Sequence, residues 1–180
     1  MMRVLVIASL VFSTVAWGAP SAAELDRVLG GYEHAATADE VKRLGAGADQ
    51  ILIGVAEDAR STAIRRTRAI AALRFVPSAA AHAYLRALIL EQGRAPAPAD
   101  VLDVAAALGA LAPYGRAELP LVQRYLGHAS AELRQSAAAA LGLIADAGAL
   151  PSLRARLAVE RDPAIRTVLS HSIKTIETPR

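Results

Sequence analysis

The chain has 180 residues, of which 54% are hydrophobic and only 4% aromatic, and its formal net charge is +3. This length suits one domain with a substantial core, and abundant Ala and Leu without alternating β-branched runs favour an all-α fold. A small basic excess spread along the whole chain is not typical of a nucleic-acid binder, and the absence of cysteine excludes disulfides, thiolate metal sites and a cysteine nucleophile.

The N-terminal segment predicts a secretory signal peptide over residues 1–23. Arg3 supplies a positive charge, residues 4–17 form an apolar stretch, and small residues follow. These small residues permit cleavage after Gly18 or after Ala23. The alternatives are a buried N-terminal helix and an uncleaved anchor, the latter disfavoured because a membrane span needs about 20 apolar residues. We therefore expect a periplasmic or secreted protein with no stable membrane span after cleavage.

Residues 24–60 predict N-terminal helices that form either a degenerate repeat or a cap. Apolar residues recur at helical spacing from Leu25 to Tyr32. Gly30 and the glycine after it predict an early end to this helix, because each costs about 1 kcal/mol relative to Ala in a helix interior. A second short helix is expected over residues 51–56.

From residue 61 onward, the sequence pattern of one helix pair occurs three times, and the first half of the pattern then occurs once more. The first helix of each copy ends in small residues followed by an apolar anchor, and the anchors Leu73, Leu108, Leu141 and Ile173 lie about 32 to 35 residues apart. This spacing is typical of stacked repeats. Arg66, Arg134 and Arg166 recur at the same place before three of the anchors, and we expect them to tie a first helix to a neighbouring turn.

The second helices align independently of the first. Residues 119–126 match residues 150–157 without a gap, and both begin with Leu-Pro, which the first turn of a helix tolerates. Ser61, Ser130 and Asp162 are the expected N-caps of the first helices. The last of these helices, over residues 163–177, has no second helix after it and is expected to be a terminal cap.

The unit from Ser130 to Leu157 carries the pattern of a known repeat family. It has a polar cap, Leu-Arg, an Ala-rich stretch, Leu-Gly, a turn with Asp and Gly, and then Ala-Leu-Pro-Ser-Leu. This unit resembles the HEAT-like repeats first noted in phycobilin lyases. The resemblance covers residues 61–177, and it implies that residues 61–180 form an α/α solenoid of about three to four repeats plus the cap helix. It concerns the scaffold alone and implies no lyase activity.

No pattern of catalytic, cofactor-binding or metal-ligating residues is found. The histidines His34, His82, His128 and His171 lie more than about 40 residues apart, and none has a second His one helical turn further on. The carboxylates are expected as isolated surface residues, apart from Glu57-Asp58, which is expected at a solvated helix end. The sequence therefore predicts no enzyme and no cofactor.

The partner-binding candidates lie on the second helices. Arg86, Gln123 and Arg154 each follow the first apolar residue of such a helix, and stacking would align them as a polar column on the concave face. An acidic segment of a protein partner suits this column, and the alternative is an ordinary solvated face. Tyr125 is the fourth candidate.

We expect the chain to act as an exported protein–protein interaction module, a scaffold or adaptor without catalysis. The alternative is an enzyme accessory or small-ligand-binding factor that uses the groove between second helices. Tyr84, Tyr125, His128 and Asp146 are the polar groups that such a factor would bring together. Nucleic-acid binding through the Arg-rich first helices is disfavoured by export.

Overall fold

The computed structural model describes residues 21–30, 36–93 and 96–178. Every regular element of these residues is helical and none is a strand, which confirms the all-α prediction. The elements of this part of the chain are, in order, α1 (Ala22–Leu29), α2 (Ala38–Lys42), α3 (Ala48–Glu57), α4 (Ala63–Ala72), η1 (Leu73–Phe75), α5 (Ala79–Gln92), α6 (Val101–Ala110), η2 (Ala112–Glu118), α7 (Leu119–Gln123), η3 (Arg124–Gly127), α8 (Ala131–Ile144), η4 (Ala147–Ala149), α9 (Leu150–Val159) and α10 (Pro163–Glu177), where η denotes a 3-10 helix.

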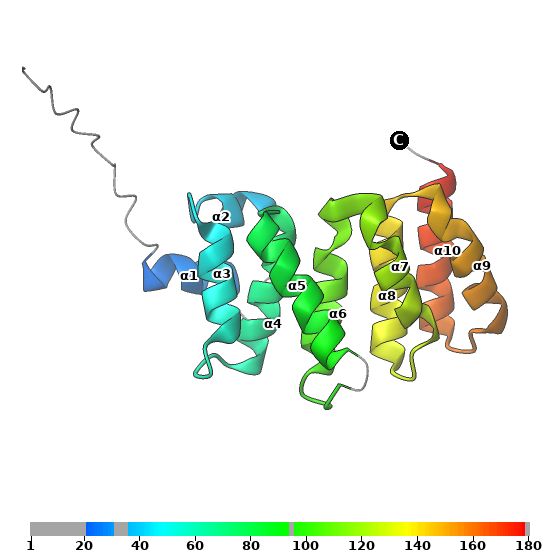
Figure 1. Ribbon diagram of the computed structural model, residues 1–180, viewed down its shortest axis with the longest axis horizontal. Coiled ribbons are helices and arrows are strands. Elements are labelled where there is room, and N and C mark those ends of the chain that lie inside the picture. Colours follow the sequence, from blue (N-terminus) through cyan, green and yellow to red (C-terminus); the bar gives the residue numbers. More distant parts are fainter. Residues whose placement is uncertain (1–20, 31–35, 94–95, 179–180) are drawn as a thin grey trace, which may run out of the picture.

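Helices α4, α6, α8 and α10 follow one another along the long axis of the molecule (Figure 1). Helix α6 packs against both α4 and α8, and α8 packs in turn against α10. Their buried residues include Ala69, Ala107 and Ala137, whose small side chains allow helix backbones to approach closely. The helices that carry Leu108 and Leu141 are therefore packing neighbours.

The remaining helices flank this row. Helix α3 packs against α4, α5 against α6, α7 against α8, and α9 against α10. The expected second helix over residues 119–126 is present as two short pieces, α7 and η3. Pro120 and Pro151 lie in the first turns of α7 and α9, as expected, where their missing N–H groups leave no helical hydrogen bond unmade.

Side-chain caps begin α4, α8 and α10, whereas Asp100 at the start of α6 makes no side-chain capping bond. Ser130 and Asp162 cap α8 and α10 as expected, each accepting backbone N–H groups of the first turn. The prediction for α4 is wrong by one residue, because Thr62 rather than Ser61 accepts the N–H of Arg65, at 3.3 Å. Both residues carry a hydroxyl group, so the residue type alone could not distinguish them.

The N-terminal part is helical as expected. Helix α1 ends at Leu29 with Gly30 as its C-cap, which confirms the early end. The expected helix over residues 51–56 lies within α3. Gly31 and Tyr32 lie outside the described residues, as does His34.

The anchor residues lie in the core. Leu73, Leu108 and Leu141 are fully buried, and Ile173 is nearly so. The buried apolar residues form one cluster that runs from Val28 in α1 to Ile176 in α10. Burial of the anchors is the main favourable contribution to stability along the row.

Two of the three recurring arginines confirm the expected structural role. Arg134 Nη1 donates to the carbonyl oxygens of His128 and Ala129, in the turn before α8, at 3.1 and 2.9 Å. Arg166 Nη1 likewise donates to the carbonyl oxygens of Leu157, in the last turn of α9, and Glu160, in the turn before α10. These bonds satisfy backbone acceptors that the turns leave unpaired.

Arg66 makes a different bond. Its Nε donates to Asp103 Oδ2 at 2.5 Å and so joins α4 to α6. It ties its helix to a neighbouring helix and not to a turn.

Within the described residues no helix has the length and apolar character needed to cross a membrane.

Candidate functional site

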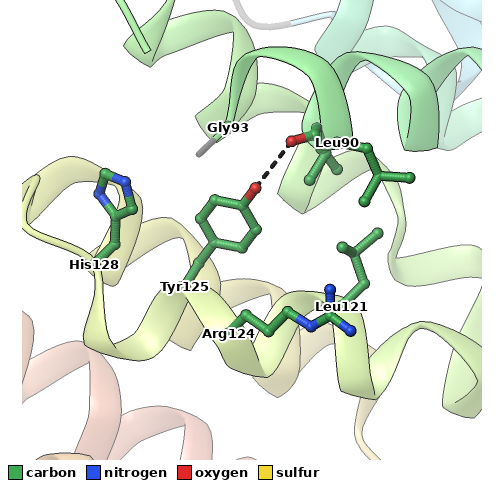
Figure 2. Close-up of a pocket in the computed structure, with 7 residues that line it drawn as sticks. Leu90, Gly93, Leu121, Arg124, Tyr125 and His128 are labelled. Carbon is green, nitrogen blue, oxygen red and sulfur yellow. Dashed lines mark hydrogen bonds between the residues drawn. The ribbon is translucent and has the colours of Figure 1, made fainter. Parts of the chain in front are cut away.

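A groove lies between the end of α5 and the α7–η3 segment (Figure 2). Its volume is about 460 Å³. We call it the Tyr125 groove, and its lining residues are Ile89, Leu90 and Gly93 from one side and Leu121, Arg124, Tyr125 and His128 from the other. It therefore joins two stretches of the chain that are distant in sequence.

Tyr125 crosses the bottom of the groove and links its two sides. Only 8% of this residue is exposed, and its hydroxyl donates to the carbonyl oxygen of Ile89 at 2.9 Å (Figure 2). The N–H of Gly93 donates to the same oxygen at 2.9 Å. A Cβ atom at Gly93 would overlap the Tyr125 hydroxyl and would lie 2.9 Å from its Cζ. A glycine is thus required here for close approach of the tyrosine.

The phenol of Tyr125 stays protonated at neutral pH. Burial raises its pKa above the ordinary value of 10.0, and the charge of Arg124 opposes this rise only in part. The hydroxyl is therefore available as a hydrogen-bond donor to Ile89 throughout the physiological range. In this position it links α5 to the α7–η3 segment.

His128 forms one end of the groove. Its ring stacks on Tyr125 with 5.8 Å between the ring centroids. His128 Nδ1 accepts the N–H of Ser130 at 3.0 Å, so the neutral ring carries its proton on Nε2. The ring is held from both sides and presents a second nitrogen that has no hydrogen-bond partner among the described residues.

The other end of the groove is apolar with one charge beside it. Leu90 is 54% exposed and faces Leu121 across the groove (Figure 2). Arg124 follows Leu121 by one helical turn and is exposed. It is the one charged residue that lines the groove as described. Since Leu90 is exposed, its side chain contributes little to the core and is accessible to a ligand, as is the basic group beside it.

Of the four partner-binding candidates, only Tyr125 lines this groove. The other three are engaged in bonds to residues at the C-terminal end of the adjacent first helix or beyond it. These bonds join Arg86 Nη1 to Glu118 Oε2 at 2.7 Å, Gln123 Nε2 to the carbonyl oxygen of Gly148 at 3.2 Å, and Arg154 Nη2 to Glu177 Oε1 at 2.5 Å. Corresponding residues thus make corresponding internal links. That they also bind a partner stays a prediction.

The four polar groups considered for a small ligand do not converge. Tyr125 and His128 lie together, but Tyr84 lines a different cleft beside Glu57 and Glu91. Asp146 caps η4, where its Oδ1 accepts the N–H of Gly148 at 2.7 Å. Of the four candidates for a ligand pocket, only Tyr125 and His128 therefore line the same groove.

The cleft at Tyr84 lies on the other side of α5 and is acidic. It has a volume of about 540 Å³ and is lined by Glu57, Glu91, Asp100 and Asp103 in addition to Tyr84 and Arg66. Burial raises the pKa of Tyr84 to about 12, and the charges of Glu57 and Asp103 add to the shift. Glu57 is exposed at the last position of α3, which confirms the solvated helix end expected there.

Three carboxylates contradict the expectation of isolated surface acids. Asp103, Glu118 and Glu160 are all buried. Each is stable in the interior because arginine side chains donate to it. The pairs are Arg66 with Asp103, Arg86 with Glu118, and both Arg134 and Arg156 with Glu160. All but the last pair join residues far apart in sequence, so spacing alone gave no signal for them.

Of the described histidines, His82 and His128 make ring-stacking contacts and side-chain hydrogen bonds. His82 Nε2 bonds Glu118 Oε1 at 2.8 Å, and its ring stacks on Tyr114 at 4.2 Å. His171 is exposed on α10 and lines an apolar cleft between α8 and α10. Within the ranges that the structure covers, no cluster of three or more His, Cys, Asp or Glu is placed to hold a metal ion.

Comparisons with known proteins assign neither a family nor a function to the chain. No protein-family model matches the chain, no curated protein matches it, and no solved structure matches its fold. The groove's own residues are therefore the basis for a function.

Proposed function

We propose that this chain is an exported protein–protein interaction module, built as a HEAT-like solenoid, that binds a protein partner in the Tyr125 groove. The observation that carries the proposal is the exposed Leu90, which faces an open groove of about 460 Å³ beside a basic residue. Exposed apolar side chains in a concave site are typical of surfaces that bury a partner's side chains. Among the described residues that line the groove, no two titratable side chains are hydrogen-bonded to each other.

The packing of the row supports a solenoid of repeated helix pairs. Successive helices α4, α6, α8 and α10 pack side by side, and each also packs against a flanking helix that precedes it in the chain, α3, α5, α7 or α9. Links that recur at corresponding residues, such as those of Arg134 and Arg166, are expected of a reused unit. The resemblance of the unit Ser130 to Leu157 to HEAT-like repeats gives the proposal its family.

The capping of α1 favours the proposed signal cleavage after Gly18 over cleavage after Ala23. Ser21 caps α1, and Ser21 and Glu24 form a reciprocal capping box in which Ser21 N–H donates to Glu24 Oε2 at 2.7 Å. Cleavage after Ala23 would remove this cap, whereas cleavage after Gly18 keeps it. Mass spectrometry of the exported protein is expected to give Ala19 as its first residue, and an N-terminus at Met1 would contradict export by a cleaved signal.

A photo-cross-linking residue at Leu90 tests the interaction. p-Benzoylphenylalanine at this position in the full chain, expressed in its native cells, is expected to yield one reproducible protein adduct. The matched control is the same residue at Leu102, which is similarly exposed on α6 and outside the groove. An adduct at both positions, or at neither, contradicts partner binding in the groove.

The size of the groove supports a second candidate, a small-ligand-binding accessory factor. Small-molecule sites span roughly 300 to 1,000 Å³, and the Tyr125 groove falls in this range. Native mass spectrometry of the protein purified from its own cells separates the two. A bound organic molecule without a protein adduct at Leu90 would favour this candidate over the interaction module.

A further inference from the structure

We propose that the Tyr125 groove recognises an acidic segment of its protein partner, in which a carboxylate pairs with Arg124 and an adjacent apolar side chain packs against Leu90 and Leu121. This inference rests on the proposed function, since it names the chemistry of the partner in the same groove. It is carried by the charge of Arg124, by its place relative to the two leucines, and by the opposite charge of the neighbouring cleft.

Arg124 is a cation without a carboxylate partner among the described residues. Most arginines on the same helices are neutralised internally, as Arg86 is by Glu118 and Arg154 by Glu177. Arg124, by contrast, is exposed at the groove and makes no ion pair or side-chain hydrogen bond within the described part of the chain. A planar guanidinium in this state favours a carboxylate from outside, which it can bind with two parallel hydrogen bonds.

The apolar contact lies beside this charge. Leu121 and Arg124 are one helical turn apart and so lie on the same face of the α7–η3 segment. Leu90, from α5, faces Leu121 across the groove (Figure 2). A groove of about 460 Å³ holds a few side chains of a partner and not a whole helix. The fitting ligand is therefore a short segment that has Leu, Ile or Phe within a few residues of Asp or Glu.

His128 adds a second donor at the opposite end. Because Nδ1 accepts the N–H of Ser130, the proton of the neutral ring lies on Nε2, which is left to donate to a ligand. Tyr125 separates His128 from Arg124 and holds both flanks of the groove in place through its bond to Ile89. Two donors on either side of Tyr125 favour hydrogen-bond acceptors such as carboxylate oxygens.

The acidic cleft across α5 distinguishes a protein segment from a polyanion. Leu90 faces the Tyr125 groove, while the next residue, Glu91, lines the cleft that also contains Glu57 and Asp100. A long nucleic acid laid over the groove would meet these carboxylates and be repelled. A short acidic segment fits within the groove and avoids them.

A selection from a displayed library of random linear peptides against the full chain tests the inference. We expect the enriched peptides to carry Asp or Glu next to a large apolar residue. Fluorescence polarisation with one such peptide should show at least about tenfold weaker binding to Arg124→Glu, a difference of about 1.4 kcal/mol. Arg116→Glu is the matched control, because Arg116 is exposed, has no side-chain partner among the described residues and lies outside the groove. The affinity of this variant for the peptide should equal that of the wild-type chain.

Reversing the charge on both the peptide and Arg124 gives the most specific test. The same peptide with its acidic residue replaced by Lys should bind Arg124→Glu more tightly than it binds the wild-type chain. Enriched peptides without acidic residues, unchanged affinity of Arg124→Glu, no enriched peptide at all, or tighter binding of a single-stranded oligonucleotide than of any peptide would each overturn the inference. If cross-linking at Leu90 still yields a protein adduct, the interaction module stands and only its acidic specificity fails.

Discussion

Glu160 concentrates more hydrogen bonds than any other carboxylate described above. Its two oxygens accept bonds from the side chains of Arg134 and Arg156 and from the backbone N–H groups of Arg161 and Asp162. The bond from Arg134, followed by that from the Asp162 N–H, holds the pKa of this carboxyl far below its ordinary value of 4.5. Glu160 thereby fixes the turn between α9 and α10.

We predict that Glu160→Gln lowers the thermal midpoint at pH 7 and flattens the acid limb of the stability curve. A carboxyl with a folded-state pKa below its unfolded value stabilises the fold above about pH 4.5 and loses that contribution as the pH falls further. The difference in unfolding free energy between wild type and variant should therefore be constant from pH 7 to about pH 5 and shrink below it. Urea unfolding at several pH values measures it, with Glu91→Gln as the control at an exposed site. A difference that grows on acidification would contradict the assignment.

The contact between Gly93 and Tyr125 gives a second prediction for single residues. Gly93→Ala should destabilise the protein by roughly 1 to 3 kcal/mol, because the added methyl group overlaps the Tyr125 hydroxyl, which forces the ring to shift, and also overlaps the carbonyl oxygen of Ile89. Tyr125→Phe alone should cost about 0.5 to 1.5 kcal/mol through the lost bond to Ile89. The double variant should be more stable than the sum of the two changes predicts, since the phenyl ring lacks the overlapping oxygen. Strict additivity in urea unfolding would show that the two residues do not touch.

Two glycines at corresponding places in α6 and α8 have different surroundings. Both follow an anchor leucine, Leu108 or Leu141, in the Leu-Gly step of the repeat pattern. A Cβ at Gly109 would meet no atom within 4 Å, whereas at Gly142 it would lie 2.9 Å from Ser172 Cβ and 3.1 Å from its Cα. The glycine of α8 therefore permits close approach of α10, and that of α6 has no such role.

We predict opposite effects when these glycines are replaced. Gly109→Ala should raise stability by about 0.5 to 1 kcal/mol, because alanine is the better helix former and the space is open. Gly142→Ala should lower stability by roughly 1 to 3 kcal/mol, because backbone atoms of α10 must move. Chemical unfolding measures the stability of both variants, and each variant serves as the control for the other. The same sign for both would contradict the difference in helix approach.

The core role of α8 is tested by two leucines on the same helix. Leu141 is fully buried and Leu143 is 59% exposed. Leu141→Ala should cost about 2 to 5 kcal/mol, because a cavity forms where no neighbour can fill it. Leu143→Ala should change stability by less than about 0.5 kcal/mol. Equal losses in thermal unfolding would mean that helix propensity, and not burial, sets the effect.

Across the whole molecule, local pattern predicted the helices better than it predicted the site. The bounds of α10, the caps at Ser130 and Asp162 and the burial of the anchors follow from short-range periodicity and capping chemistry, which depend on neighbouring residues alone. The groove depends on how α5 and α7 are rotated and spaced, which no local pattern specifies. Arg124 and Leu90 were therefore missed, and Tyr125 was found only as a polar group on a second helix.

The proposed solenoid predicts that destabilisation stays local. In a row of nearest-neighbour interfaces, stability is a sum of unit and interface terms, so a defect at one end need not open the other. Leu169 is fully buried in α10, which packs against α8 and α9. Leu169→Ala should speed amide hydrogen exchange in these three helices and leave α3 and α4 unchanged, while the mirror variant Leu52→Ala, in α3, should do the reverse. Equal acceleration along the entire chain in both variants would mean that the helices unfold as one cooperative globule, and the proposed solenoid would then be wrong even though every helix is in place.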